Sequence, residues 1–422
     1  MAAVGQPVKV TDAKTLAEEL TRIADICHGC RRCFSLCPSF DVLFKGLDVP
    51  EVDGEAGKLP GKVLADFVDL CYECKLCLPH CPYIPPHRWQ VDIPHLVLDA
   101  RRVRMDERGL SLRERMLSNP DRLGRLSSPV APVANFANTL PVARWAMEKT
   151  LGISAKKALP RFVGETFTAW FRKRPKPALP AEPSARVVFY PTCSVEWNRP
   201  EIGKAAVQVL ERNGVEVVVE YPRCCGMPFF DVGDTASAQA ARTDVVGALK
   251  PWVDKGFTVV TPGPSCSLMI KKEYTWLPGA DGDAAAVSKA TRDLGEFLVE
   301  LKAKGKLDLR FPAAPKSVAY HLACHLKVQN IGYKSRDLLA MTGAAVTMVE
   351  KCSGHDGTWA MKAEYFDESM KVGKKLFDGL AEAKADVVAS DCVLAGVQIR
   401  QGMDLPVKHP IEVLRDAYGM AE

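Results

Sequence analysis

Hydrophobic positions recur at helical spacing in two stretches, each of which leads directly into a group of cysteines. TLAEELTRIADIC runs from Thr15 to Cys27, and LPGKVLADFVDLC runs from Leu59 to Cys71. Apolar residues three and four positions apart form one face of a helix, and that face packs against a neighbour. The pattern therefore predicts a small helical domain at the N-terminal end of the chain.

Farther along the chain, the pattern changes to short runs rich in β-branched residues. Four such runs, RVVFY, TVVTP, SVAYH and DVVAS, each end a few residues before a cysteine, namely Cys193, Cys266, Cys324 and Cys392. Helical stretches such as EIGKAAVQVLER lie between them. Strands that alternate with helices predict α/β modules with parallel sheets. The four cysteines should then lie at the carboxyl ends of strands, where such sheets collect their ligands.

The fifteen cysteines fall into two groups along the chain. Eight lie between Cys27 and Cys81, seven are spread from Cys193 to Cys392, and none lies between the groups. We take this gap as a domain boundary. The divisions that we expect are a helical cluster domain at 1–110, a basic helical linker at 111–185, and two modules at 186–310 and 311–422.

Composition indicates a globular protein, and the expected location of the chain indicates what its cysteines bind. The chain has 422 residues, of which 47% are hydrophobic and 25% are charged, and its net charge of +5 is too small to favour nucleic acid. The opening MAAVGQPVKVTDAK lacks the basic and apolar regions of a secretory signal, so we expect a cytoplasmic location. Cytoplasmic thiols stay reduced, and clustered cysteines there favour metal over disulfide bridges.

The first cysteine group contains one motif twice, CHGCRRCFSLCP from Cys27 and CYECKLCLPHCP from Cys71. Three closely spaced thiolates can wrap one side of a 4Fe-4S cluster, and in two-cluster proteins the fourth cysteine of each run binds the other cluster. Zinc sites use two separated pairs more often than this spacing. The predicted ligand sets are Cys27, Cys30, Cys33 and Cys81 for one cluster, and Cys71, Cys74, Cys77 and Cys37 for the other.

The second cysteine group is an internal repeat. Cys193 is followed by Cys224-Cys225-Gly226 and then by Cys266, and 131 residues after Cys193 the order recurs as Cys324, Cys352-Ser353-Gly354 and Cys392. A repeated spacing of this kind predicts two copies of one module, with cysteines at matching positions. If the two copies face each other, they can enclose a site between their strand ends.

These motifs resemble a known family. FYPTCSVEWNRPEIG, RCCGMPFFDVGD and PSCSLMIKKEY resemble the Cys-Cys-Gly domain of iron-sulfur oxidoreductases related to heterodisulfide reductase, a family that includes the D subunit of that enzyme and the C subunit of anaerobic glycerol-3-phosphate dehydrogenase. The first cysteine group resembles the helical ferredoxin domain of succinate dehydrogenase iron-sulfur subunits. The fold that we expect is α+β and multidomain, with a helical two-cluster ferredoxin domain followed by two duplicated α/β Cys-Cys-Gly modules.

The resemblance implies a further metal site in the modules, with Cys224 and Cys225 as the candidate catalytic residues of a disulfide-cleaving centre. The fullest family pattern ends in Cys-x-x-Cys, whereas this chain has Met269 and Ala395 at the last position. Inert buried cysteines are the alternative. Module one retains the thiols of Cys193, Cys224, Cys225 and Cys266 for an iron-sulfur cluster or zinc. Module two retains Cys324, Cys352 and Cys392, with His321, His325 and His355 as conceivable additional ligands.

The linker is rich in arginine and contains the amphipathic, Trp-bearing pieces LPVARWAMEKTLGI and FTAWFRKRPKPALP. Such pieces can lie on anionic lipid. They can equally pack the two halves of the chain together or dock a flavoprotein. Peripheral contact with the cytoplasmic face of a membrane therefore stays open.

The sequence lacks both a dinucleotide fingerprint and a P-loop, so hydride chemistry must come from another chain. We expect an oxidoreductase subunit that passes electrons from a partner flavoprotein dehydrogenase through two 4Fe-4S clusters to the modules. By resemblance, the final acceptor is a quinone. Two alternatives stay open: a reductase of disulfides or other sulfur compounds at module one, with a thiol/disulfide acceptor, and a non-redox scaffold stabilised by metal.

Overall fold

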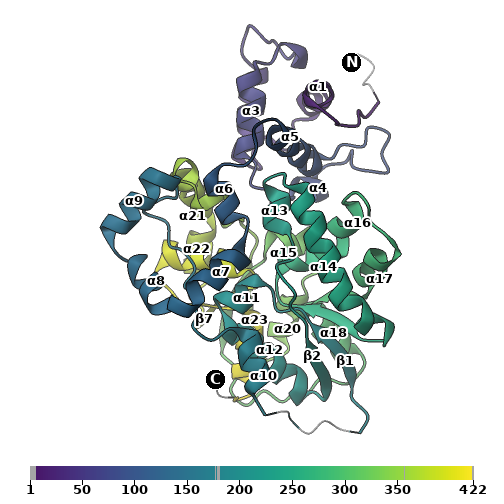
Figure 1. Cartoon of the computed structure of the whole chain (residues 1–422), viewed down its shortest axis with the longest axis vertical. Helices are drawn as coiled ribbons and strands as arrows, with labels where there is room; N and C mark the ends of the chain where they lie inside the picture. Colours follow the sequence, from purple (N-terminus) through teal and green to yellow (C-terminus); the bar gives the residue numbers. More distant parts are fainter. Residues whose placement is uncertain (1–5, 176, 178–180, 356, 421–422) are drawn as a thin grey trace. The chain divides into compact units, whose positions relative to one another are not determined.

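The computed structural model describes residues 6–175, 177, 181–355 and 357–420, which form two compact units (Figure 1). The first unit comprises Met1–Glu114 and Pro228–Thr235, and the second comprises Arg115–Met227 and Ala236–Glu422. A short segment of the first module thus belongs to the N-terminal unit. The boundaries expected at residues 110, 185 and 310 stay predictions, and residues 176 and 178–180 of the linker lie outside the described residues.

The first unit is helical, as the apolar spacing predicts. Asp12 caps its first helix, because the carboxylate accepts a hydrogen bond of 2.9 Å from the backbone N–H of Thr15. Its core contains the buried rings of Phe40, Phe44 and Phe67. The helices are α1 (Ala13–Cys30), α2 (Pro38–Leu47), α3 (Gly61–Leu70), α4 (Cys77–His80) and α5 (Ile93–Arg108), with a 3₁₀ turn at Ala56–Lys58.

The linker is also helical. It begins with α6 (Leu112–Leu117) and continues with α7 (Pro120–Ser127), a 3₁₀ turn at Ser128–Val130, α8 (Ala131–Ala137), α9 (Pro141–Leu151) and α10 (Phe167–Lys173). Prolines stand in the first turn of α7, α8 and α9, where the missing N–H has no helical partner to lose. The prolines that interrupt the sequence pattern therefore start helices.

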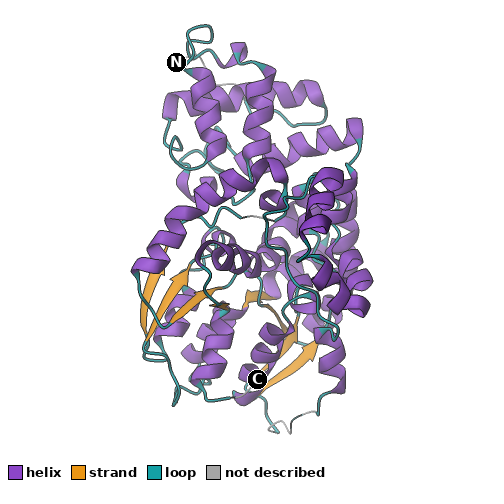
Figure 2. Ribbon diagram, turned by 90° about the vertical axis from the view of Figure 1, so that its left-hand side faces the viewer, coloured by secondary structure: helices purple, strands orange, loops and turns teal. Residues whose placement is uncertain are grey.

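The second unit contains two four-stranded parallel sheets, drawn in orange in Figure 2. The first has the order β2-β1-β3-β4 and the second the order β6-β5-β7-β8. The strands are β1 (Ala185–Phe189), β2 (Val215–Val219), β3 (Thr258–Thr261), β4 (Thr291–Asp293), β5 (Ser317–His321), β6 (Ala345–Val349), β7 (Val387–Ser390) and β8 (Val407–Lys408). Identical strand order confirms the duplication and the α/β class of the modules.

Helices connect the parallel strands, as crossover connections require. Module one contains α11 (Cys193–Trp197), α12 (Pro200–Arg212), α13 (Met227–Asp231), α14 (Thr235–Asp254), α15 (Pro264–Leu268), a π-helical turn at Met269–Glu273, α16 (Tyr274–Trp276), α17 (Gly282–Ala290) and α18 (Leu294–Ala303). Module two contains α19 (Cys324–Lys327), α20 (Lys334–Ala340), α21 (Phe366–Glu382), α22 (Val393–Met403) and α23 (Pro410–Ala417), with 3₁₀ turns at Trp359–Met361 and Ala363–Tyr365.

The two modules share a hydrophobic core. Ile202 and Val209 of α12 and Ile411 and Leu414 of α23 belong to one buried cluster that also includes Phe189 of β1. Burial of large apolar side chains stabilises a fold by roughly 1.5–3 kcal/mol each. The modules therefore depend on each other for stability. Among the described helices, none is both long enough and apolar enough to cross a bilayer.

Gly354 offers a test of the module-two loop. Its φ is +69°, and a Cβ built on it would lie 2.0 Å from the carbonyl oxygen of Ser369. Gly343 has a φ of +90° with nothing within 4 Å of such a Cβ. We expect Gly343→Ala to cost about 1 kcal/mol of unfolding free energy and Gly354→Ala roughly 3 kcal/mol or more, because the latter adds a clash to the backbone strain. Thermal unfolding followed by circular dichroism measures both, and equal losses would contradict the clash.

Candidate metal centres

The structure brings together one set of four thiols in the first unit. Cys27, Cys30 and Cys33 of the first run line a small cavity with Cys81 of the second run. Cys27 lies in the last turn of α1, and Cys81 directly follows α4. This grouping is the one that the exchanged fourth cysteine predicts. Iron binding by each of these residues stays a prediction.

Cys37 of the first run lies near two members of the second predicted set. Cys37, the residue before α2, is among the groups whose charge acts on both Cys71 and Cys77. Cys33 of the first set also acts on Cys77, so the two sets are neighbours. Cys74 lies in the loop between Cys71 and Cys77, where the spacing places the remaining thiol.

Left-handed backbone positions shape the loops between these cysteines. Arg31 has a φ of +52° and ends α1 directly after Cys30, while Glu73 and Lys75 flank Cys74 with φ values of +52° and +58°. Non-glycine residues adopt this conformation at a cost of roughly 1–2 kcal/mol each. These left-handed residues reverse the direction of the backbone, so that very short loops can turn the thiols of neighbouring cysteines toward one metal site. A regular helix could not do this.

Burial favours the protonated form of several of these thiols. Burial, followed by the charges of Cys81 and Cys30, raises the pKa of Cys33 to about 12. Burial likewise raises the pKa values of Cys27, Cys71 and Cys77 well above that of a free thiol. A metal binds the thiolate form, and its positive charge stabilises a thiolate that water does not solvate. Both sets therefore fit a cationic inorganic cluster.

A half-buried cation stands beside the second set. The Arg101 guanidinium donates hydrogen bonds to the carbonyl oxygens of Cys71, Val68 and Asp231, with distances of 3.3 Å to Val68 and 2.7 Å to Asp231. Its charge acts on the Cys71 thiol and on the buried Glu73 carboxyl. Arg101 thus binds the backbone carbonyl of Cys71, a candidate ligand, and contributes positive charge next to the Cys71 thiol.

The same guanidinium holds the segment Pro228–Thr235, which begins two residues after Gly226 and belongs to the first unit. Phe230 is buried there, and the ammonium of Lys75 lies 5.4 Å from the centre of its ring. Gly233, with a φ of +86°, packs so closely that a Cβ would lie 2.5 Å from the backbone nitrogen of Arg102. The chain that leaves the Cys-Cys-Gly element is therefore part of the surroundings of the second set.

Module one brings its four cysteines together in two close pairs. The sulfur atoms of Cys193 and Cys224 are 3.8 Å apart, and those of Cys225 and Cys266 are 3.4 Å apart. Cys224, Cys225 and Cys266 are buried. Cys193 is the first residue of α11 and follows β1, and Cys266 lies in α15 and follows β3. Both residues therefore lie beyond the carboxyl ends of parallel strands. This is the position that the sequence pattern predicts.

Backbone and tyrosine contacts fix the Cys-Cys element. The Tyr190 hydroxyl donates to the carbonyl oxygen of Arg223 at 2.6 Å, and the Tyr274 hydroxyl donates to that of Cys225 at 2.9 Å. Gly226 adopts a φ of +90°, and a Cβ there would lie 2.9 Å from the Cβ of Ala241 in α14. The glycine is required because the loop packs directly on this helix.

Asp121 of the linker also belongs to this centre, although no sequence motif points to it. Its buried carboxylate accepts hydrogen bonds from the backbone N–H of Cys224 at 2.6 Å, the Tyr221 hydroxyl at 2.6 Å and the Trp197 indole at 2.8 Å. Its charge acts on the thiols of Cys193 and Cys224. A linker residue thus contributes negative charge at module one.

In module two, Cys324 starts α19 after β5, Cys352 follows β6, and Cys392 follows β7, the positions that match module one. Ser353, which replaces the second cysteine, is buried, and its hydroxyl donates to the carbonyl oxygen of His355 at 3.4 Å. Three cysteines at the strand ends make this copy poorer in thiols than module one.

The three candidate histidines of module two differ in their contacts. The His325 ring lies 2.9 Å from the Ser265 hydroxyl, and Nδ1 of His321 lies 2.9 Å from the Ser390 hydroxyl. Within the described part of the chain, Nε2 of His321 and both ring nitrogens of His355 have no hydrogen-bond partner. Burial lowers the pKa of His321 to about 4, so its ring stays neutral and able to bind a metal.

The cysteine-bearing ends of the two modules face each other. Nε2 of His409 donates to the carbonyl oxygen of Pro262 at 3.0 Å, and Gln329 donates to the Ser267 hydroxyl at 2.8 Å. Cys392 is among the groups whose charge acts on Cys266. The modules therefore enclose one region that contains thiols from both copies.

No three His, Cys, Asp or Glu side chains in the described residues are placed to bind one metal ion together. A 4Fe-4S cluster requires a different arrangement, because each of its four iron atoms binds one thiolate, so the four thiols need not converge on one point.

Comparisons with known proteins match three stretches of the chain. Residues 19–82 match the 4Fe-4S dicluster domain family, and residues 187–271 and 318–400 each match the cysteine-rich domain family. The C subunit of anaerobic glycerol-3-phosphate dehydrogenase from Escherichia coli K12 is 30% identical over 327 residues, which cover 76% of this chain and 81% of the relative. The chain belongs to the family of that protein. It is an iron-sulfur protein that carries two 4Fe-4S clusters in its N-terminal part.

A shorter relative is lactate utilization protein A. The protein from Bacillus pumilus is 28% identical over 249 residues, covering 54% of this chain and 98% of the relative. That from Geobacillus kaustophilus is 29% identical over 245 residues, with the same two coverages.

The exchange of fourth ligands can be tested with paired substitutions. If Cys81 serves the cluster of Cys27, then Cys81→Ala and Cys27→Ala each remove about four iron atoms per chain, and the double variant removes no more. Cys81→Ala combined with Cys71→Ala should remove about eight, because it damages both clusters. Iron and acid-labile sulfide counts on anaerobically purified protein measure this. If the Cys81→Ala and Cys27→Ala double variant instead loses about eight iron atoms and the Cys81→Ala and Cys71→Ala double variant only about four, each run holds its own cluster.

Arg101 should raise the reduction potential of the second cluster. A unit charge acting over about 8 Å at an effective dielectric constant of about 20 is worth about 2 kcal/mol, on the order of 100 mV for one electron. We expect Arg101→Gln to lower the potential of one cluster by that order and to leave the other nearly unchanged. EPR-monitored redox titration separates the two clusters.

Arg108 is the matched control, because it lies two turns farther along α5, is exposed, and makes no side-chain hydrogen bond or ion pair within the described residues. Arg108→Gln makes the same change in net charge. Equal shifts in the two variants would show that Arg101 acts only through net charge.

Proposed function

We propose that this chain is the electron-transfer subunit of a dehydrogenase complex, which receives electrons from a partner flavoprotein and delivers them to an acceptor such as quinone. The observation that carries this proposal is the cavity that Cys81 shares with Cys27, Cys30 and Cys33, within the match to the dicluster family. Clusters of this kind supply one-electron transfer. A chain with two neighbouring clusters suits a donor that gives up two electrons.

The side chains around the clusters would protect them and set their potentials. Apolar residues such as Phe44 and Val91 line the cavity of the first set and limit the access of water. The half-buried Arg101 and the buried Glu73 place side chains of opposite charge type beside the second set. Charge and exposure are the main means by which a protein sets the potential of an iron-sulfur cluster.

The relatives support a dehydrogenase partner. One is named as a component of anaerobic glycerol-3-phosphate dehydrogenase, and the other is named for lactate utilization. We propose that the partner of this chain oxidises a small hydroxylated metabolite of this class, a glycerol phosphate or an organic acid. We also propose a cytoplasmic location at the periphery of the membrane, where a quinone acceptor is available.

Anaerobic purification provides the first test. We expect EPR signals from at least two reducible 4Fe-4S clusters in the full chain, because the match to the dicluster family contains two complete cysteine runs. Stopped-flow absorbance should show that the reduced clusters are reoxidised by a short-chain quinone. A preparation without reducible clusters would end the proposal, and clusters that reduce normally but never react with quinone would exclude only the acceptor.

A second candidate function is reduction of a disulfide or other sulfur compound at module one. The close pairs Cys193–Cys224 and Cys225–Cys266 favour it. A pocket of about 600 Å³ adjoins Cys224, since Asp121, which accepts from the Cys224 N–H, lines it together with Arg122, Arg125 and Arg223. Turnover of small disulfides by the pre-reduced chain would support this function. If the chain does not react with them, electron transfer remains as its only proposed function.

A further inference from the structure

Positive charge is concentrated in one part of the second unit. Residues 115–161 contain eight Lys or Arg and two Asp or Glu, a net charge of +6, so the other 375 residues together carry −1. The chain as a whole is only mildly basic, and this segment accounts for all of its excess. A concentration of one sign of charge attracts a surface of the opposite sign.

The same segment exposes an unusual number of large apolar side chains. Half of the fourteen exposed large hydrophobic residues among the described residues lie within it, and we call these seven the linker face: Leu126, Val130, Val133, Phe136, Leu140, Val142 and Trp145. Val133 and Phe136 are three positions apart in α8, and Val142 and Trp145 are three apart in α9, so each pair shares one side of its helix. Exposed apolar groups gathered in this way mark an interaction surface.

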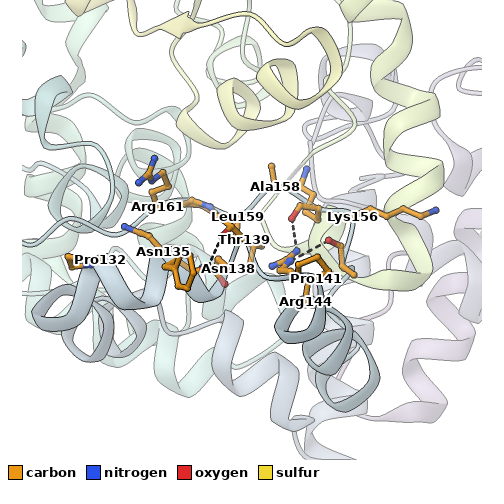
Figure 3. A pocket seen from close by; sticks show the side chains of 14 residues that line it. Pro132, Asn135, Asn138, Thr139, Pro141, Arg144, Lys156, Ala158, Leu159 and Arg161 are labelled. Atoms are coloured by element: carbon orange, nitrogen blue, oxygen red, sulfur yellow. Dashed lines mark hydrogen bonds between the residues drawn. The ribbon is translucent and has the colours of Figure 1, made fainter.

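A pocket of about 870 Å³ opens between α8, α9 and the loop Ala155–Arg161 (Figure 3). Four of its fourteen lining residues are cationic, none of the fourteen is acidic, and several of the others are apolar. Phe136 belongs both to this pocket and to the linker face. The pocket thus combines positive charge with apolar walls, which suits a ligand that is anionic at one end and apolar at the other.

Hydrogen bonds hold the pocket in shape. The Arg144 guanidinium donates to the carbonyl oxygens of Ser154 at 2.7 Å and Lys157 at 2.6 Å, which fixes one end of the loop. The Asn135 amide pairs with both backbone groups of Phe162 at 2.8 Å and 2.9 Å, which fixes the other end. Figure 3 shows Asn135 and Arg144 on opposite sides of the pocket. The site is therefore built before any ligand arrives.

Two polar side chains of the pocket are available to a ligand. In the described part of the chain, the guanidinium of Arg161 and the side-chain amide of Asn138 make no hydrogen bond or ion pair. Both groups can donate hydrogen bonds to a phosphate oxygen, and a guanidinium donates two in parallel. They provide the anion-binding end of the site.

We propose that the linker face docks on an anionic lipid bilayer and that the pocket receives the phosphate of a lipid headgroup at Arg161 and Asn138. The apolar side chains of Phe136, Val142 and Trp145 enter the acyl boundary, where tryptophan is favoured. A bilayer fits better than a protein partner, because the excess charge has a single sign over the whole segment and an anionic membrane attracts each Lys or Arg by about 1 kcal/mol. This inference rests on the peripheral location proposed above.

Vesicle co-sedimentation of the full chain tests the proposal. We expect binding to vesicles of equimolar phosphatidylcholine and phosphatidylglycerol, and little binding to phosphatidylcholine alone. Trp145→Ala should weaken partition to the anionic vesicles about tenfold, because it removes a buried apolar contact. Arg161→Glu should weaken it at least tenfold, because it reverses a charge at the surface.

Matched variants outside the face give the controls. Trp276 is also an exposed tryptophan, and Lys304 is an exposed cation without a side-chain partner among the described residues. Trp276→Ala and Lys304→Glu should bind vesicles as the parent does. Equal losses in the controls, or full binding by both Trp145→Ala and Arg161→Glu, would overturn the proposal and leave the linker face to a protein partner.

Cluster spectra recorded on the same samples separate this inference from the proposed function. All four variants should retain the EPR signals and the quinone reactivity of the parent, since none lies at a cysteine. Absence of vesicle binding with intact electron transfer would refute the docking alone. Vesicle binding with clusters that accept no electrons would support the docking and refute the electron-transfer role.

Discussion

The N-terminal unit depends on one constraint: eight partly buried thiols must act as thiolates. Burial raises the pKa values of Cys27, Cys33 and Cys77, and a bound cation stabilises the charged form of such thiols. In the predicted ligand sets, each cluster takes a cysteine from both runs, so the segments that lead into Cys27 and Cys71 must pack together. If the fourth cysteines are exchanged in this way, the metal clusters and the helical core of this unit stabilise each other.

The second unit uses the same elements twice with different results. Both sheets have the same strand order, and both place cysteines at the carboxyl ends of their strands. Module one keeps four thiols in two close pairs, whereas Ser353 and its buried hydroxyl occupy the matching position in module two. The shared core and the contact of His409 with the first module keep the poorer copy in place. Module two can thus serve the centre of module one without matching its ligand set.

Patterns that are local in sequence allowed much of this structure to be predicted. The two cysteine runs, the short strands before Cys193 and Cys324, and the repeat of 131 residues are all visible in the chain itself. The contacts of Asp121 with Cys224 and of Arg101 with Asp231 were not predictable, because each joins residues more than a hundred positions apart. No periodicity or spacing marks such pairs. The sequence marks the linker as basic and amphipathic, but only the structure shows which of its apolar residues remain exposed.

The placement of Pro228–Thr235 in the N-terminal unit has a consequence for biosynthesis. A ribosome that has completed Glu114 has made the cysteine runs but not the segment that packs on Arg101. Domains usually fold as units while synthesis proceeds. Here the first unit must wait for residue 235, so newly made chains pass through a stage in which the neighbourhood of the second thiol set is open. Iron and sulfide delivered during translation would meet their least obstructed target in that interval.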